Sequence, residues 1–155
     1  MRRRIQPRLR QGGAAALPYW RNPDPLARKY LEMIRAADGI VFVMPVWWNS
    51  VLGMLKGFID KIMKEGEGLS HTVTHTGIHG ELGNIRHAYV FTTSTSPTIY
   101  LRLIAGDGVK RLFVNCTLKQ LGMKGRKWIN FGGVSDSSPE RRRRYLDKVC
   151  AIRFK

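Results

Sequence analysis

The chain has 155 residues, 43% of them hydrophobic, which is enough for one domain with a buried core. No apolar run approaches the ~20 residues of a membrane span, and the first residues lack the apolar core of a signal peptide. Two cysteines are too few for a disulfide framework, so a reducing cytoplasm is the expected location. The formal net charge of +16 would attract polyanions, but the clusters Arg2–Arg4 and Arg141–Arg144 do not form one stripe, and nucleic acid is therefore not an expected partner.

Residues 1–23 show no hydrophobic periodicity and are rich in Arg, Gly, Ala and Pro. They predict a disordered or extended basic arm, in which Tyr19 and Trp20 could dock on a single domain formed by residues 24–155. Asp24 followed by Pro25 is typical of a helix start. The helix is expected to end near residue 37. Its predicted inward face comprises Leu26, Tyr30, Met33, Ile34 and Ala37.

Ile40 to Met44 are five consecutive apolar residues, mostly β-branched or aromatic, which predicts a strand buried on both faces of a parallel sheet. Pro45 ends the run because it has no N–H for the ladder. The predicted turn that follows comprises Val46, Trp47, Trp48 and Asn49. A helix is expected from about Ser50 to Lys64. Its predicted buried stripe comprises Val51, Leu52, Leu55, Phe58, Ile59 and Ile62.

The next 21 residues, EGEGLSHTVTHTGIHGELGNI, contain five glycines and several threonines, which predicts a long irregular loop of the kind used as a lid or binding loop. His71, His75 and His79 are four residues apart and would share one face of a helix. The surrounding Thr, Val and Gly do not favour that helix, and neither cysteine nor a carboxylate pair completes a ligand set. We therefore expect no metal site here.

A second buried strand is predicted from His87 to Thr93, followed by a turn rich in hydroxyl groups that ends near Tyr100. A short apolar helix is then predicted from Ile99 to Ala105. A further helix is predicted over residues 109–121, with Gly122 as its C-terminal cap. Its predicted buried residues are Leu112, Phe113 and Cys116, the cysteine serving as a small hydrophobic residue.

The chain ends with a third predicted strand, Lys127 to Phe131, whose alternating pattern is typical of a sheet edge. Ser138-Pro139-Glu140 starts the last helix, with Tyr145, Leu146 and Val149 facing inward. Strands that alternate with helices predict a parallel α/β sheet with right-handed crossovers.

In such a sheet, the turns after neighbouring strands meet at the carboxyl edge and line a crevice. The first turn offers the flat indoles of Trp47 and Trp48 and consecutive backbone N–H groups. The second turn offers hydroxyl groups, further N–H groups and the phenol of Tyr100. A planar, partly polar ring system would suit this crevice. The alternative is that the two tryptophans close the top of the core.

Three blocks of the sequence resemble the flavodoxin-like NAD(P)H:quinone oxidoreductases: Ala37-Asp38 before an apolar strand, Pro45-Val46-Trp47-Trp48, and Leu55-Lys56-Gly57-Phe58-Ile59-Asp60-Lys61. The second half agrees, with Thr92-Thr93, Tyr100 and a Ser-Pro-Glu-Arg helix in the family's order. The resemblance covers residues 24 to 149 and implies a flavodoxin-like three-layer sandwich around a parallel sheet.

The resemblance also implies a flavin, FAD or FMN, that passes hydride from NAD(P)H to a quinone-like acceptor in a homodimer. The flavin would supply the reactivity, and the protein would supply orientation and hydrogen bonds. Tyr100 would face the ring or the acceptor. The residues implied in holding the flavin are Pro45, Val46, Trp47, Trp48, Asn49, Thr92, Thr93, Ser94 and Thr95.

Two features depart from the family pattern. Gly106 occupies the position of a histidine found in animal quinone reductases, which leaves no proton relay there. The strand and Ser/Asn-rich phosphate loop that open the family's fold have no counterpart, so we expect an N-terminally incomplete fold whose Ile40–Met44 strand is an exposed edge. The alternative function is a non-catalytic α/β protein that binds an anionic partner, such as nucleic acid, through its basic surface.

Overall fold

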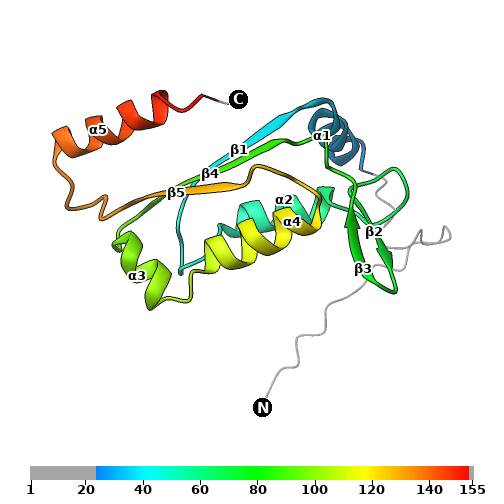
Figure 1. The fold of residues 1–155 in the computed structure, drawn as a ribbon, viewed down its shortest axis with the longest axis horizontal. Coiled ribbons are helices and arrows are strands. Elements are labelled where there is room, and N and C mark those ends of the chain that lie inside the picture. Colours follow the sequence, from blue (N-terminus) through cyan, green and yellow to red (C-terminus); the bar gives the residue numbers. More distant parts are fainter. Residues whose placement is uncertain (1–23, 154–155) are drawn as a thin grey trace, which may run out of the picture.

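The computed structural model describes residues 24–153, so the arm predicted over residues 1–23 lies outside the described part. Figure 1 shows a sheet between two layers of helices, which confirms the predicted α/β class and its three layers. The sheet has the order β1-β4-β5, and both neighbouring pairs are parallel. Its strands are β1 (Gly39–Pro45), β4 (His87–Ser94) and β5 (Lys127–Gly132).

The helices cover both faces of the sheet, and one of them lies at the end of its strands. One face of the sheet carries α1 (Pro25–Ala36), α2 (Gly53–Ile62) and the long helix formed by η1 (Val109–Thr117) and α4 (Leu118–Gln120). The other face carries α5 (Pro139–Cys150), and α3 (Thr98–Leu103) lies near the carboxyl ends of the strands. Within residues 24–153, no helix is long and apolar enough to cross a bilayer.

Helix α1 is fixed at both ends by side chains. The Asp24 carboxylate caps the first turn by accepting from the Leu26 N–H at 2.9 Å. The hydrogen-bonded Lys61 ammonium and this N–H lower the pKa of Asp24, so its contribution to stability is present above the ordinary pKa and is lost as the pH falls through the lowered value. At the other end, the Asn84 amide donates to the carbonyls of Ile34 (2.8 Å) and Ala37 (2.7 Å).

The predicted inward face of α1 was partly wrong. Ile34 is buried as expected, but the other buried positions are Ala27 and Leu31, while Leu26 and Met33 are exposed. The buried face is therefore centred on Ala27, Leu31 and Ile34, about one residue further along the helix than predicted. The exposed rim of the helix still makes one ring contact, because Tyr30 meets Phe58 of α2 edge-on at 5.7 Å between ring centroids.

Strand β1 was expected to be buried on both faces, and that prediction was wrong. Phe42 and Met44 point into the core beneath α2 and η1, but Val41 and Val43 point to the opposite face and are exposed. Among residues 24–153, no strand pairs with the outer side of β1, so β1 is an edge strand of the described sheet. By contrast, β4 is central and buried along nearly its whole length, as predicted.

Helix α2 begins at Gly53, three residues later than expected, because Leu52 before it is still extended. Its predicted stripe does face the core, with Ile59 and Ile62 buried and the other members partly buried. Gly57 lies in the middle of the helix, and nothing is within 4 Å of the place where a Cβ would be.

Gly57→Ala is therefore expected to stabilise the protein by about 0.5–1 kcal/mol, because it removes the entropic cost of glycine inside a helix without creating a clash. Urea unfolding of the two proteins side by side measures this difference. A loss of stability would contradict the prediction and would mean that something packs on the Gly57 side of α2 in solution.

The segment predicted as an irregular loop contains an antiparallel hairpin, β2 (His71–Thr74) and β3 (Gly77–Gly80). Gly80 explains how the hairpin packs, since a Cβ there would lie 2.0 Å from the Leu121 carbonyl carbon at the end of α4. The Leu82 N–H then donates to the Leu121 carbonyl at 3.0 Å. No group of three metal-ligating residues occurs in the described part of the chain, and the three histidines do not share a helix face.

The helix predicted over residues 109–121 exists, but η1 winds as a π-helix. Its wider turn replaces the 3.6-residue period on which the predicted inward face depended. Phe113 is buried as expected and meets Phe42 at 5.3 Å, but Leu112 and Cys116 are exposed, so the predictions for these two residues were wrong. Gly122 has φ +86° and ends the helix as predicted.

Helix α5 starts as predicted, with the Ser138 hydroxyl accepting from the Arg141 N–H at 3.3 Å. Tyr145, Leu146 and Val149 face the sheet, but none of them is buried. Tyr145 stacks on Phe131 of β5, with ring centroids 4.5 Å apart. The layer that α5 forms over the sheet is therefore open on the β1 side.

Candidate functional site

The two turns predicted to meet do lie together at the carboxyl edge of the sheet. Pro45 pairs with Thr93 at the end of the parallel β1/β4 ladder. The Val46 N–H then donates to the Thr93 carbonyl at 2.7 Å, which extends the pairing one residue past the proline. The chain after β1 and the chain after β4 are thus held side by side where they leave the sheet.

The first turn has a fixed backbone. Trp47 and Ser50 exchange hydrogen bonds of 3.2 and 3.0 Å, and the two residues between them, Trp48 and Asn49, have φ of 50° and 60°. Positive φ is uncommon for a bulky residue and persists only where the surroundings determine it. Trp47 is 62% exposed and Trp48 is 93% exposed, so the alternative that both indoles close the core is not what the structure shows.

The backbone of this turn also has unused donors. Within residues 24–153, no hydrogen bond uses the N–H groups of Trp48 or Asn49, and both residues are exposed. Two consecutive free N–H groups beside a flat indole can satisfy the carbonyl edge of a planar ring. This combination of an apolar face and a polar edge is the chemistry that the sequence predicted for the crevice.

The second turn rests on a buried hydrogen-bond network centred on Asn130 of β5. The Asn130 amide accepts from the Thr92 hydroxyl (2.7 Å) and donates to the hydroxyls of Ser94 (2.9 Å) and Thr98 (2.8 Å). The indole N–H of Trp128 donates to the Thr92 hydroxyl at 2.8 Å. This network ties β4, β5 and the start of α3 together directly beneath the turn.

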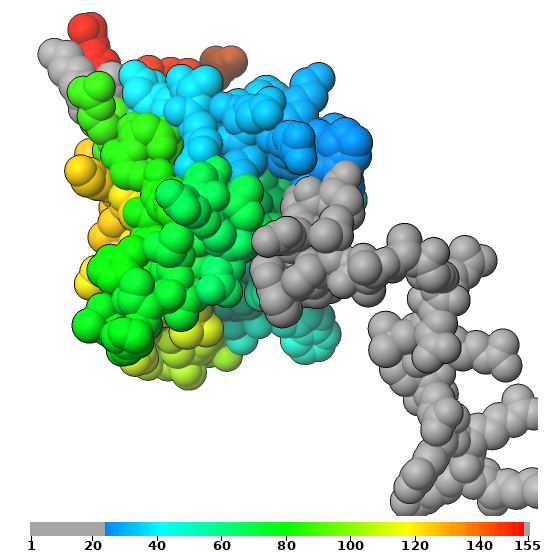
Figure 2. Space-filling model, turned by 90° about the vertical axis from the view of Figure 1, so that its right-hand side faces the viewer, coloured from blue at the N-terminus to red at the C-terminus, as the bar shows by residue number. Residues whose placement is uncertain are grey.

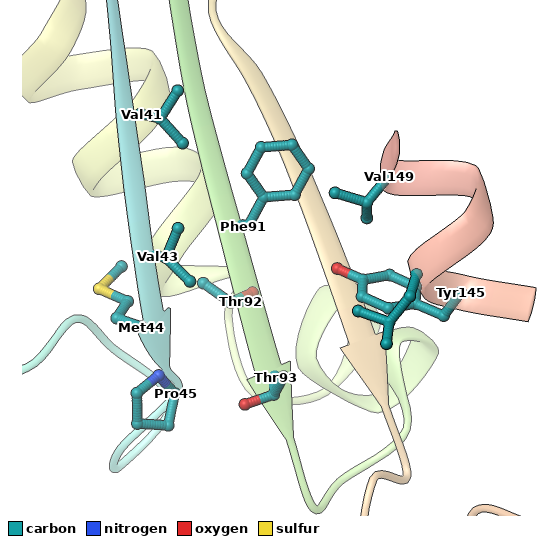
Figure 3. Close-up of a pocket in the computed structure, with 10 residues that line it drawn as sticks. Val41, Val43, Met44, Pro45, Phe91, Thr92, Thr93, Tyr145 and Val149 are labelled. Atoms are coloured by element: carbon teal, nitrogen blue, oxygen red, sulfur yellow. The ribbon is translucent and has the colours of Figure 1, made fainter. Parts of the chain in front are cut away.

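The hydroxyl groups of the second turn therefore have different roles from those expected. Thr92 is 1% exposed and Ser94 is 6% exposed, and both hydroxyls are used inside the protein. Thr93 points to the α5 face (Figure 3), and Thr95 is exposed at the tip of the turn. A ligand in the crevice would meet the backbone of this turn and Thr95 rather than the hydroxyls of Thr92 and Ser94.

Tyr100 lies on α3 and is 40% exposed. Its carbonyl accepts from the N–H groups of Ile104 and Ala105, both at 3.0 Å, which ends the helix. The chain then turns back through Gly106 and Asp107, which both have positive φ. One carboxylate oxygen of Asp107 is buried, with no hydrogen-bond partner in the described part of the chain.

Gly108 connects this third turn to the first. A Cβ at Gly108 would lie 2.7 Å from the Asn49 carbonyl oxygen, so only glycine permits the observed contact. The turn after α3 therefore supports the Trp47–Ser50 turn from below. The turns after β1, β4 and α3 are far apart in the sequence, and together they form the carboxyl edge of the sheet.

A hollow of about 480 Å³ lies next to the second turn, between the start of α3 and the end of β5. Gly132 permits this close approach, because a Cβ there would lie 2.5 Å from the Thr98 nitrogen. On the rim, the Arg141 guanidinium donates to the Gly132 carbonyl at 2.9 Å and lies over the Phe131 ring. A second nitrogen of this guanidinium donates to the Gly133 carbonyl at 3.5 Å.

Residues 3–152 match the model of the family described as having a flavodoxin-like fold. The chain belongs to this family. The crevice at the carboxyl ends of the strands is where open α/β sheets of this kind bind their ligands. The flavodoxin-like resemblance seen in the sequence is thereby confirmed for the fold.

Individual relatives match over limited parts of their length. The Escherichia coli K12 protein named uncharacterized NAD(P)H oxidoreductase YcaK is 36% identical over 53 residues, which make up 32% of this chain and 27% of that protein. Smu.1420 from Streptococcus mutans UA159 has a TM-score of 0.74 and 23% identity, covering 83% of this chain and 65% of its own. An FMN-dependent NADH-azoreductase from Bacillus anthracis, solved with FMN, has a TM-score of 0.65 and 18% identity, covering 80% and 58%.

Within this flavodoxin-like domain, sequence reasoning missed the residues that support the crevice from below. Asn130 and Trp128 act through contacts that span 32 residues or more. One local signal was available for Asn130, because asparagine is disfavoured inside strands and its presence in KWINF indicates a special partner. Gly108 carries no such signal, since its importance depends on a carbonyl 59 positions earlier in the chain.

Proposed function

We propose that this chain is a flavin-dependent NAD(P)H oxidoreductase that passes hydride to a quinone-like acceptor. The observation that carries the proposal is the Trp47–Ser50 turn, which presents an exposed indole beside two free backbone N–H groups. A flavin ring has an apolar face and a carbonyl edge, and this turn is complementary to both. When bound, the flavin supplies the capacity to accept hydride from NAD(P)H and to give it to an acceptor.

In this proposal, the residues of the chain bind and orient the ring. The backbone from Val46 to Asn49 meets its polar edge, Pro45 and Trp47 bound it on one side, and Thr93 to Thr95 bound it on the other. Trp48 and Tyr100 face the open side, where a second planar molecule would lie. No side chain is required as a nucleophile, because the reacting electrons belong to the two bound molecules.

The comparisons support the same class of activity. One relative is named as an NAD(P)H oxidoreductase and one neighbour in structure as an FMN-dependent NADH-azoreductase. Azo compounds and quinones are both planar, conjugated acceptors of two electrons, which suits a crevice with open aromatic side chains. The thiols of Cys116 and Cys150 are free and exposed, which fits the reducing cytoplasm that we propose as the location.

Purified protein mixed with FMN or FAD is expected to keep yellow flavin absorbance after free ligand is removed, and NADH or NADPH should bleach that absorbance. Trp47→Ala should weaken flavin retention about 10- to 100-fold, because one face of the ring loses its stacking partner. Arg144→Ala is the matched control, since this exposed residue lies on α5, away from the turn. Tyr100→Phe should slow acceptor reduction more than it weakens retention.

Folded, soluble protein that retains neither FMN nor FAD would overturn the proposal. Equal losses in Trp47→Ala and Arg144→Ala would place the flavin somewhere other than this turn. Bleaching by only one of NADH and NADPH would decide between the two donors.

We also propose that the active form is a homodimer. Large apolar side chains near the carboxyl edge are exposed in the single chain, among them Met54, Leu103 and Ile104. Exposed apolar surface of this extent is typical of interaction sites. Sedimentation velocity, with and without bound flavin, measures the proportion of dimer.

A further inference from the structure

An apolar hollow of about 550 Å³ lies between the sheet and α5, on the face opposite to α2 and η1. Figure 3 shows Val41, Val43 and Phe91 on the sheet side of this hollow, facing Tyr145 and Val149 on the helix side. Aliphatic and aromatic side chains make up nearly all of its lining. This volume and this lining are typical of sites that bind small organic molecules.

The hollow is elongated and opens along β1. Its lining follows this strand from Val41 to Pro45, which corresponds to about 13 Å of extended chain. Val41 is 47% exposed and Val43 is 80% exposed, so the apolar wall continues to the surface. Figure 2 shows β1 (cyan) and α5 (red) together at the top of the molecule. An extended apolar chain therefore fits this hollow better than a compact ring system does.

Two hydroxyl groups lie in the half of the hollow nearer the carboxyl edge of the sheet (Figure 3). They belong to Thr93 of β4 and Tyr145 of α5. Burial raises the pKa of the Tyr145 phenol, so the phenol stays protonated at neutral pH and can donate a hydrogen bond. The hydroxyl of Thr92, which also borders the hollow, already donates within the protein. A ligand that fits here has an apolar body and a polar group at one end.

Helix α5 adds positive charge beside this hollow, because it carries five basic and two acidic side chains. Arg142 comes three residues before Tyr145 and four before Leu146, a spacing that places all three on one helix face. The Arg142 guanidinium donates to the Ser137 hydroxyl at 2.9 Å. Among residues 24–153, no carboxylate pairs with it. An anionic group at the end of an apolar ligand would therefore meet an arginine that has no acidic partner in the described chain.

These features together distinguish between possible occupants of the hollow. An inorganic anion would leave the apolar walls in contact with water, and a neutral hydrocarbon would leave Arg142 without an anionic partner. A second copy of the chain would bring another formal charge of +16 to a surface that is already basic. A single-chain amphiphile with an anionic head is complementary both to the apolar walls and to the arginine.

We propose that the hollow beneath α5 binds a long-chain carboxylate, such as a free fatty acid. Its alkyl chain lies between Val43 of β1 and Tyr145 of α5, and its carboxylate lies toward Arg142. This site goes beyond the proposed flavin chemistry and does not depend on it, since it is on the α5 face of the sheet and not in the Trp47–Ser50 turn.

Calorimetric titration of the full-length chain with octanoate, decanoate and dodecanoate, each below its critical micelle concentration, tests the proposal. The affinity is expected to rise about fourfold for each added CH₂, because each one buries further apolar surface in the hollow. Decanol has the same chain as decanoate but no charge, so it reports the contribution of the apolar walls alone.

Two pairs of substitutions locate the chain and the head of the ligand. Val43→Glu should weaken the binding of decanoate and decanol alike by about tenfold or more, because it places a charge among the apolar walls, and Val73→Glu on the exposed hairpin is its control. Arg142→Gln should weaken decanoate binding by about 5- to 10-fold and leave decanol binding unchanged, which also shows that the hollow has stayed folded. Arg144→Gln is the matched control, because this exposed residue is not on the face of α5 that lines the hollow, and it should change neither affinity.

The absence of binding, or an affinity that does not depend on chain length, would overturn the proposal. Equal losses in Val43→Glu and Val73→Glu would also overturn it, since the ligand would then lie elsewhere. Equal losses of decanoate affinity in Arg142→Gln and Arg144→Gln would mean that the head group responds only to the general charge of the protein. Binding that appears only when a dimer dissociates on dilution would assign the hollow to a second copy of the chain.

Discussion

Asn130→Ala is expected to destabilise the protein by about 3–4 kcal/mol, the largest effect of any single substitution at the candidate site. The amide makes three hydrogen bonds to the hydroxyls of Thr92, Ser94 and Thr98. Thr92 and Ser94 are buried, so water cannot replace the lost partner without opening the sheet. A stable domain has only about 5–15 kcal/mol in total, so this loss is a substantial fraction of it.

Urea unfolding of Asn130→Ala measures the loss, and Asn115→Ala on the exposed side of η1 is the matched control. Thr92→Val should also destabilise, and the double variant should lose less than the sum of the two, because both substitutions break the same network. Additive losses would show that Thr92 and Asn130 act separately, which would contradict the network.

The elements of the fold were predictable because their signals are local. A run of apolar residues predicted each strand, and the alternation of strands with helices predicted a parallel sheet. Asp24-Pro25 and Ser138-Pro139 marked two helix starts that the structure confirms by their capping hydrogen bonds. Capping depends only on residues two or three positions apart, so it can be predicted from sequence alone.

The errors arose where a neighbouring element decides the outcome. Val41 and Val43 have the composition of a buried strand, but their exposure depends on which segment lies over them. The inward face of residues 109–121 depended on a 3.6-residue period, and η1 has the wider π-helical turn, which moved Leu112 and Cys116 to the surface. Gly77 and Gly80 suggested an irregular loop, although Gly80 is required where the hairpin packs on α4.

The crevice was predicted at the level of segments but not of atoms. Parallel strands bring the Pro45–Asn49 and Thr92–Tyr100 turns together, and the Val46–Thr93 hydrogen bond confirms that they meet. The sequence did not predict that Thr92 and Ser94 turn their hydroxyls inward, because alternation along β4 places them on the face that meets Asn130. The flavin contacts that we propose for this edge are therefore made through its backbone.

Gly108→Ala is expected to weaken flavin retention by about tenfold or more, although it removes no side chain from the crevice. The added methyl group would lie 2.7 Å from the Asn49 carbonyl oxygen, so the Trp47–Ser50 turn must move away from the turn after α3. The backbone at Gly108 has φ −54°, which alanine adopts without strain. Any effect therefore comes from the displaced turn and not from the conformation of residue 108.

Flavin titration of Gly108→Ala, with Gly57→Ala as the matched control, measures this effect. Both substitutions add one methyl group to a glycine with negative φ, but the space around Gly57 is empty. Gly108→Ala should lose affinity and Gly57→Ala should not. Unchanged affinity in Gly108→Ala would mean that the free N–H groups of Trp48 and Asn49 do not hold the ring, because displacing them by even a few tenths of an ångström weakens hydrogen bonds of ordinary length. If the proposed function is right, the position of one backbone turn, set by a contact between residues 49 and 108, controls how tightly this edge holds the flavin.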